Sequence, residues 1–171
     1  MAVHVTKCIL VMLLLAGCRD ADERGEAPGA AAPLIRSRLE AAVASGATSF
    51  DFAAADPAFD WDRMHIFGPY RTKAEVAKEL GFSWSGFDRT TIETSDSVVL
   101  VVFVRDGKVV HWYEHPRDAG DLAPLGGRRG YTRTEATFRI ERRKETRGEW
   151  VELKPLETRS STTAPVEGLQ P

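Results

Sequence analysis

The chain has 171 residues, with 23 Lys and Arg against 25 Asp and Glu, which gives a formal charge of −2 at pH 7. This nearly balanced charge provides no electrostatic footprint for a polyanion, so no nucleic-acid partner is expected. The sequence contains no P-loop, Gly-x-Ser-x-Gly or His-Glu-x-x-His motif. We therefore expect no cofactor, and a binding protein is favoured over an enzyme.

A short hydrophobic run near the amino end predicts a signal peptide. The apolar stretch extends from Cys8 to Ala16 and is preceded by Lys7. A membrane-spanning helix needs roughly 20 apolar residues, which is more than this run provides. A buried amino-terminal helix is the alternative, but Arg19 to Glu26 offers no amphipathic continuation. A positive end and a short apolar stretch are typical of secretory signal peptides, so residues 1–17 are expected to be removed.

The predicted cleavage site, Leu15-Ala16-Gly17-Cys18, resembles the lipobox of bacterial lipoproteins, which has a Leu, two small residues and a Cys. The resemblance implies that Cys18 carries diacylglycerol on its sulfur and an acyl chain on its amino group. Two or three chains would hold the protein on a membrane, since each buried methylene contributes about 0.8 kcal/mol. In enteric bacteria, Asp directly after this Cys retains a lipoprotein in the inner membrane, but here Arg19 follows. We therefore expect the outer membrane, facing the periplasm.

Composition divides the rest of the chain into a tether, one domain and a tail. Residues 18–32 are charged or rich in Ala, Gly and Pro, and residues 158–171 are similarly poor in apolar side chains, so both are expected to be disordered. About 125 residues lie between them, at 33–157, which is enough for one core but not for two. Cys18 is the only cysteine after residue 17, so no disulfide is expected.

Apolar periodicity predicts the first elements of the domain. A stripe led by Ile35 and Leu39 predicts a helix over 33–45. A short strand should follow, with Phe50 and Phe52 on one face.

A second strand is predicted over 61–67, and a capping box then starts the next helix. Thr72 is followed three residues later by Glu75, so each side chain can bond the backbone N–H of the other. Gly81 should end this helix.

The clearest pattern is a hairpin. The stretch 98–104 is apolar at every position, which is typical of a central strand covered on both faces. Asp106-Gly107 is a preferred two-residue hairpin turn. This turn predicts that Phe103 pairs with Val110, which places Trp112 on the same face as Phe103.

The carboxyl-terminal part predicts two more strands. Ala136, Phe138 and Ile140 alternate with polar residues, and Val151 and Leu153 indicate a partner strand. Strands that follow one another through hairpins favour antiparallel pairing. The sequence therefore predicts a single α+β domain, mainly an antiparallel sheet with two helices on one side.

Part of this domain resembles a group of small, uncharacterised bacterial envelope proteins. The matching residues are Trp61-Asp62-Arg63, Phe67-Gly68-Pro69-Tyr70 and the Leu80-Gly81 helix end. No activity is established for that group, so the resemblance implies a fold only.

Two clusters contain metal-ligating residue types, but neither has the spacing of a metal site. His111 and His115 are four apart, which on a strand separates them by roughly 13 Å. Asp56, Asp60 and Asp62 lack the tighter spacing and the glycine turn of a calcium loop. We expect turn and strand residues here, and no metal is predicted.

Two loops are candidates for binding. The stretch 126–131, GGRRGY, has glycines and arginines that could hold an anion, but without the context of a phosphate loop a solvated turn is favoured. In the stretch 81–89, Trp84 and Phe87 either fold onto the sheet as a lid or join Arg89 in a partner-binding surface.

These features predict a lipid-anchored protein of the bacterial envelope that acts as a binding, scaffold or assembly factor. Its expected partners are the membrane, through Cys18, and an envelope protein or ligand. The alternative is a periplasmic hydrolase or an inhibitor of one, and no catalytic residue is assigned. A concave polar pocket would favour this alternative, whereas a flat sheet with an aromatic patch would favour binding.

Overall fold

The computed structural model describes residues 31–55, 59–127, 129–146 and 148–156. These residues form short helices, 3₁₀ turns (η) and strands. In chain order they are α1 (Ala31–Ala44), β1 (Ser49–Asp51), α2 (Phe52–Ala55), β2 (Arg63–Phe67), α3 (Lys73–Leu80), η1 (Ser85–Arg89), β3 (Val98–Arg105), β4 (Lys108–Pro116), η2 (Arg117–Ala119), η3 (Ala123–Leu125), β5 (Tyr131–Thr132), β6 (Thr137–Glu145) and β7 (Gly148–Pro155). None of the described helices is both long and apolar enough to cross a membrane.

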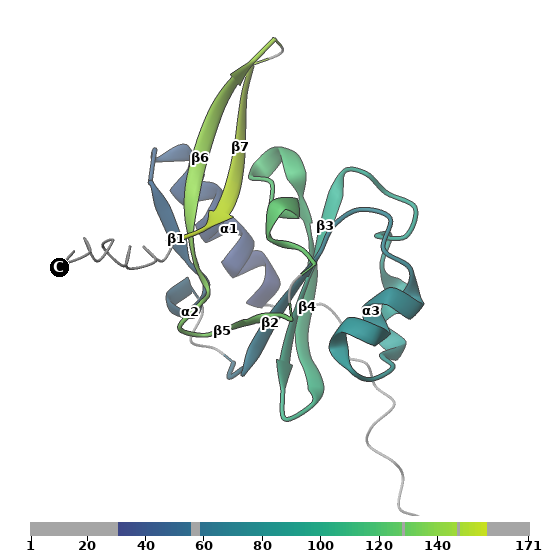
Figure 1. Ribbon diagram of the computed structural model, residues 1–171. Coiled ribbons are helices and arrows are strands. Elements are labelled where there is room, and N and C mark those ends of the chain that lie inside the picture. Colours follow the sequence, from purple (N-terminus) through teal and green to yellow (C-terminus); the bar gives the residue numbers. More distant parts are fainter. Residues whose placement is uncertain (1–30, 56–58, 128, 147, 157–171) are drawn as a thin grey trace, which may run out of the picture.

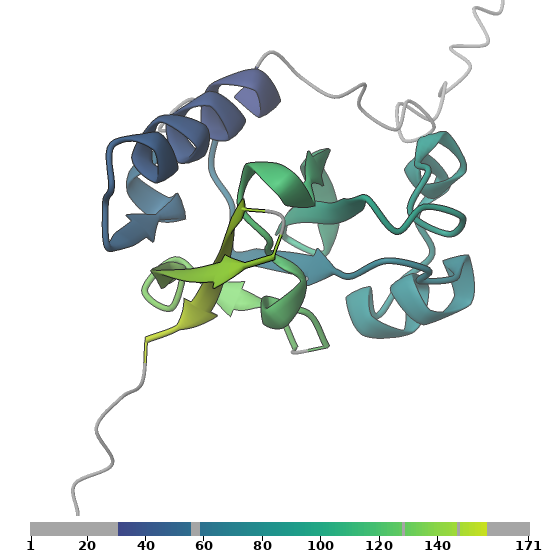
Figure 2. The same cartoon turned by 90° about the horizontal axis from the view of Figure 1, so that it is seen from above.

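The strands form two antiparallel sheets, and the α+β class is as predicted. One sheet has the order β4-β3-β2-β5 and the other the order β1-β6-β7. Helix α1 and the three-stranded sheet lie on one side of the four-stranded sheet, and α3 lies on the other (Figures 1 and 2). The expectation that both helices cover one side is therefore wrong. The physical reason is that β3 is apolar on both faces and needs cover on each.

The two faces of the four-stranded sheet define two hydrophobic cores. The larger core joins Val99, Val101 and Phe103 of β3 to Ile35 and Leu39 of α1, and it also includes the inner face of the three-stranded sheet. The smaller core lies under α3 and η1. Its buried members are Phe67, Val76, Trp84, Phe87, Ile92, Leu100, Val102, Val104 and Trp112.

The helix termini follow the sequence signals. Helix α1 begins at Ala31, within the predicted tether, and ends at Ala44, and Gly46 follows in the left-handed region with φ +79°. There the Ala47 N–H donates to the Ala42 carbonyl at 3.0 Å, the bond that marks a Schellman motif. The capping box that starts α3 is present, with its C-cap at Gly81 as predicted.

The hairpin forms at the predicted turn, but its predicted register fails beyond the tip. Arg105 pairs with Lys108 as expected, whereas Phe103 pairs with His111 instead of Val110. The register shift lies between Phe103 and Val104 and is a β-bulge, which inserts one extra residue in β4 and exchanges the faces of all later side chains. Trp112 therefore joins the core under α3, on the face opposite Phe103.

The other strand predictions differ only at their ends. Phe50 and Phe52 are both buried and lie edge to face at 4.9 Å, but Phe52 belongs to the short helix α2 and not to the strand. Strands β6 and β7 pair over their whole length and extend from the body as a two-stranded ribbon (Figure 1). Phe138 of β6, Leu153 of β7 and Ala136 just before β6 are fully buried.

A histidine is enclosed in the larger core. His115 of β4 has no exposed surface, and burial lowers the pKa of its imidazole from 6.5 to about 4. Arg36 of α1 lowers the pKa further, while the backbone of Gly120 and the Glu40 carboxylate oppose this effect. His115 is therefore neutral in the folded protein at pH 7.

The burial of His115 predicts that the domain loses stability in acid. Below pH 6.5 the unfolded chain binds a proton at this residue, whereas the folded chain does so only near pH 4. This residue's contribution should be constant above pH 6.5 and fall by roughly 3 kcal/mol by pH 4. Urea unfolding at pH 7 and at pH 4.5 should show a smaller loss for His115→Leu than for the wild type. Equal losses in the two proteins would contradict the assignment.

Candidate functional site

A polar cleft of about 670 Å³ lies beside α3, on the face of the four-stranded sheet that this helix covers. Arg63 and His65 of β2 line the cleft together with Glu79 of α3, and Arg129 and Gly130 line it from the connection before β5. Side chains on β2 alternate between faces, so Arg63 and His65 point away from the larger core that holds Met64 and Ile66. We refer to this feature as the His65 cleft.

His65 and Glu79 face each other in the cleft without a hydrogen bond. The imidazole is only 4% exposed, and its Nδ1 lies 3.7 Å from Oε1 of Glu79. Neither atom has a hydrogen-bond partner among the described residues. A buried polar atom without a partner costs about 1–3 kcal/mol, so the cleft holds two groups that a ligand could satisfy.

Gly130 lets the loop approach His65 closely. A Cβ added at Gly130 would lie 2.8 Å from two atoms of the His65 ring, and the residue has φ +79°. Both features require glycine, because other residues are strained at this φ and have no space for a side chain. The Phe67 ring lies parallel to the imidazole, with 6.1 Å between the ring centroids.

The cleft contains charged side chains of both signs, and they differ in the hydrogen bonds that they already make. Asp62 accepts a bond from the Asp106 N–H at 2.8 Å. Glu135 accepts bonds from the N–H and hydroxyl of Thr132, which lower the pKa of its carboxyl. By contrast, within the described chain, Arg129 makes no side-chain hydrogen bond or ion pair. Arg63 makes one long bond, 3.4 Å, to the Arg129 carbonyl.

A second cleft of about 550 Å³ shares Glu79 and Arg129 with the first. Arg71 and Lys78 add two further cations to its lining. The two clefts thus adjoin along α3, between that helix and the loop that carries Arg129.

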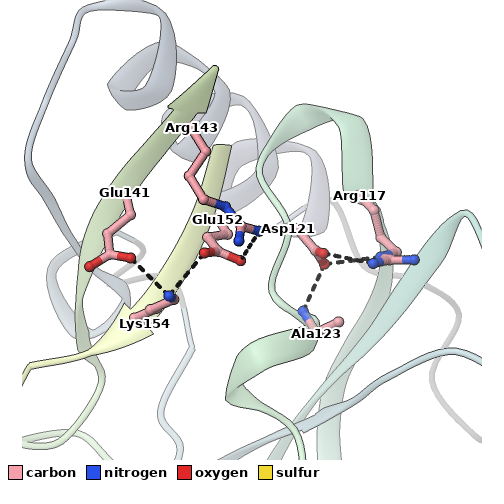
Figure 3. Close-up of polar contacts among 7 residues, drawn as sticks. All are labelled: Arg117, Asp121, Ala123, Glu141, Arg143, Glu152 and Lys154. Carbon is pink, nitrogen blue, oxygen red and sulfur yellow. Dashed lines mark hydrogen bonds and ion pairs between the residues drawn. The ribbon is translucent and has the colours of Figure 1, made fainter. Parts of the chain in front are cut away.

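A charged network fastens the connection that leads to this loop (Figure 3). The Asp121 carboxylate receives two bonds from the Arg117 guanidinium, at 3.0 and 2.8 Å, and one from the Ala123 N–H at 2.9 Å. Backbone bonds on both sides of Asp121 join it to β7, where its bridge partner is Glu152. The chain segment between β4 and β5 is thereby tied to the three-stranded sheet.

Glu152 continues this network across β7. Its carboxylate lies 3.0 Å from Arg143 and 3.0 Å from Lys154, and Lys154 also bonds Glu141 at 2.9 Å (Figure 3). Asp121 and Glu152 are only 3% and 5% exposed, yet each is matched by cations. We interpret this network as a brace that holds the loop, because ion pairs at 2.8–3.0 Å match its two buried acids.

The structure does not support the predicted partner surface at residues 81–89. Trp84 and Phe87 are 8% and 4% exposed, and Trp84 lies edge to face with Trp112 at 5.4 Å. The guanidinium of Arg89 lies 5.6 Å from the ring centre of Trp112. Trp84 and Phe87 thus fold onto the sheet as a lid, the alternative to a partner-binding surface. They do so because the bulge in β4 turns Trp112 toward them.

The remaining candidates do not meet in a site. Cys18 and Asp56 lie outside the described residues. Asp60 forms an ion pair with Arg105 at 2.9 Å. Across the part of the chain that the structure describes, no three His, Cys, Asp or Glu residues are placed to hold a metal ion.

Sequence reasoning missed His65, Glu79 and Arg63, and it recognised the loop with Arg129 only as a weaker candidate for anion binding. The residues of the cleft are spread from β2 to the start of β5, and none of them forms a local motif. The one available signal was the glycine-arginine run at 126–131, whose glycines permit the close approach to His65.

Comparison of the chain with protein-family models, curated proteins and solved structures gives no match. The resemblance to small envelope proteins therefore stays a prediction.

The close approach at Gly130 predicts a cost for a single added methyl group. Gly130→Ala and Gly127→Ala both place alanine at positive φ, +79° and +76°, which should cost about 1 kcal/mol each. Only Gly130→Ala also collides with His65, and such overpacking adds roughly 1–3 kcal/mol. At Gly127 the nearest atom is 3.7 Å away, so this variant is the control. Urea denaturation should rank Gly130→Ala as clearly less stable, and equal stabilities would refute the packing.

Proposed function

We propose that this chain is a lipid-anchored protein of the bacterial envelope and that its domain is a binding, scaffold or assembly factor that uses the His65 cleft. The anchor rests on the Leu15-Ala16-Gly17-Cys18 pattern, and Arg19 after the cysteine favours the outer membrane, facing the periplasm. The membrane is thus the first partner, through lipid on Cys18. The second is an envelope component that enters the cleft.

One observation carries the binding proposal. The buried Nδ1 of His65 and Oε1 of Glu79 lie 3.7 Å apart and have no hydrogen-bond partner among the described residues. Ligand sites are usually clefts of about 300–1,000 Å³ with a few convergent polar groups, and the 670 Å³ cleft falls in this range. Polar groups without hydrogen-bond partners in a cleft of this size are typical of a ligand-binding domain.

The rival function is a periplasmic hydrolase, or an inhibitor of one, and the same pair of residues supports it. A carboxylate beside an imidazole can orient a general base, and such contacts are often long before substrate binds. However, Thr132 supplies the only hydroxyl side chain among the described lining residues, and it is held by Glu135 at 2.8 Å. Hydrolysis would therefore need water as the nucleophile, so we favour binding.

The lipid anchor predicts labelling at one residue. Growth with a fatty-acid probe should label the wild-type protein and leave Cys18→Ser unlabelled, because that variant lacks the sulfur that receives diacylglycerol. Cys8→Ser is the matched control and should keep the label, since Cys8 lies in the segment that is removed. Label on Cys18→Ser at the wild-type level would end the lipoprotein proposal.

The binding proposal predicts capture that depends on the cleft. The full-length protein should be cross-linked in envelope membranes and purified as the wild type, Arg129→Gln and Arg36→Gln. A component captured by the wild type should be reduced at least fivefold with Arg129→Gln, because this exposed cation lines both clefts. Arg36→Gln, on the exposed side of α1, should capture it normally. Identical capture by all three proteins would show that the cleft is not the binding site.

A further inference from the structure

We propose that the His65 cleft binds a short peptide with a free carboxylate and a free amino group. The carboxylate would lie between Arg63 and Arg129, and the amino group would lie at Glu79. This inference rests on the proposed function, since it names the class of ligand for the same cleft.

The two arginines of the cleft, Arg63 and Arg129, are suited to bind a carboxylate. Arg129 has no side-chain partner among the described residues. Arg63 makes a 3.4 Å bond to the backbone of Arg129 and lies near enough to Glu135 to help lower the pKa of that carboxyl. Guanidinium groups bind carboxylates through two parallel N–H···O bonds. Two arginines with donors to spare, joined by the 3.4 Å bond in one cleft, therefore provide a site for one carboxylate.

Glu79 offers an acceptor in the same cleft. Glu79 reaches the cleft from α3, and its side chain is 17% exposed. Its Oε1 accepts no hydrogen bond from a described residue, so an ammonium or amide N–H of a ligand would satisfy it.

The mixture of charges argues against a ligand of one sign. A phosphate could bind the arginines but would leave Glu79 without a partner, and like charges at close range are unfavourable. A simple amine would in turn be repelled by Arg63 and Arg129. A zwitterion can bind the arginines through its carboxylate and Glu79 through its amino group.

Apolar side chains complete the cleft. Leu80, Phe82 and Val104 line it beside the charged residues, and Leu80 and Phe82 are only partly buried by the core. They can contact a small apolar side chain or methyl group. A dipeptide of alanine has both charges and two methyl groups, and it is small enough for a cleft of about 670 Å³.

The test uses full-length protein in detergent micelles and four probes: dialanine, N-acetyl-dialanine, dialanine amide and inorganic phosphate. Affinities are measured by NMR titration so that weak binding is quantified. Dialanine should bind, and blocking either terminus should weaken binding at least tenfold. Phosphate should bind more weakly than dialanine.

Variants test which residue binds the carboxylate of the peptide and which binds its amino group. Arg129→Gln should weaken dialanine at least tenfold but change dialanine amide less than twofold, since the amide lacks the carboxylate. Glu79→Gln should weaken dialanine and leave N-acetyl-dialanine unchanged. Arg36→Gln is the matched control and should bind like the wild type.

Several results would overturn the ligand class: no binding of dialanine, equal binding of the blocked peptides, or tighter binding of phosphate. If these results occurred while cross-linked capture still depended on Arg129, the proposed function would stand and only the zwitterionic peptide would be excluded. If capture also lost its dependence on Arg129, the function proposed for the cleft would fail as well.

Discussion

Strand β3 is buried on both faces, and this constraint fixes the position of most other elements. Residues Val99 to Phe103 have no exposed surface. Successive side chains of a strand point to opposite faces, so one row needs cover from α1 and the three-stranded sheet, and the other needs cover from α3 and the aromatic lid. The layered arrangement in Figures 1 and 2 follows from this requirement.

The cover on the α3 side is incomplete, and the cleft occupies the uncovered part. Helix α3 has eight residues and spans about 12 Å, whereas eight residues of strand β3 span about 26 Å. Trp84 and Phe87 extend the cover over Trp112, at β4. At the β2 side of this face, the polar residues Arg63 and His65 line the cleft.

The cleft also depends on a loop that is held from a distance. The bonds between Arg117 and Asp121, and those of Asp121 to β7, fix the segment between β4 and β5. The same segment leads to Gly130, which lies against His65. A site whose walls are already in position loses less conformational entropy when a ligand binds. The brace therefore favours binding in the cleft by fixing the loop that lines it.

The sequence by itself determined the elements whose signals are local. The capping box at Thr72, the helix end at Gly81 and the Asp106-Gly107 turn are each decided by a few neighbouring residues, and the structure confirms all three. It also determined the α+β class, because alternation and apolar runs reflect the faces of single strands. The tertiary structure decided what depends on distant partners. The bulge in β4 reversed the face of Trp112 and buried Trp84, and no local pattern encodes an extra residue in a ladder. The pairing of His65 with Glu79 and the approach of Gly130 arise only when β2, α3 and a later loop pack together, so the cleft could be found only in three dimensions.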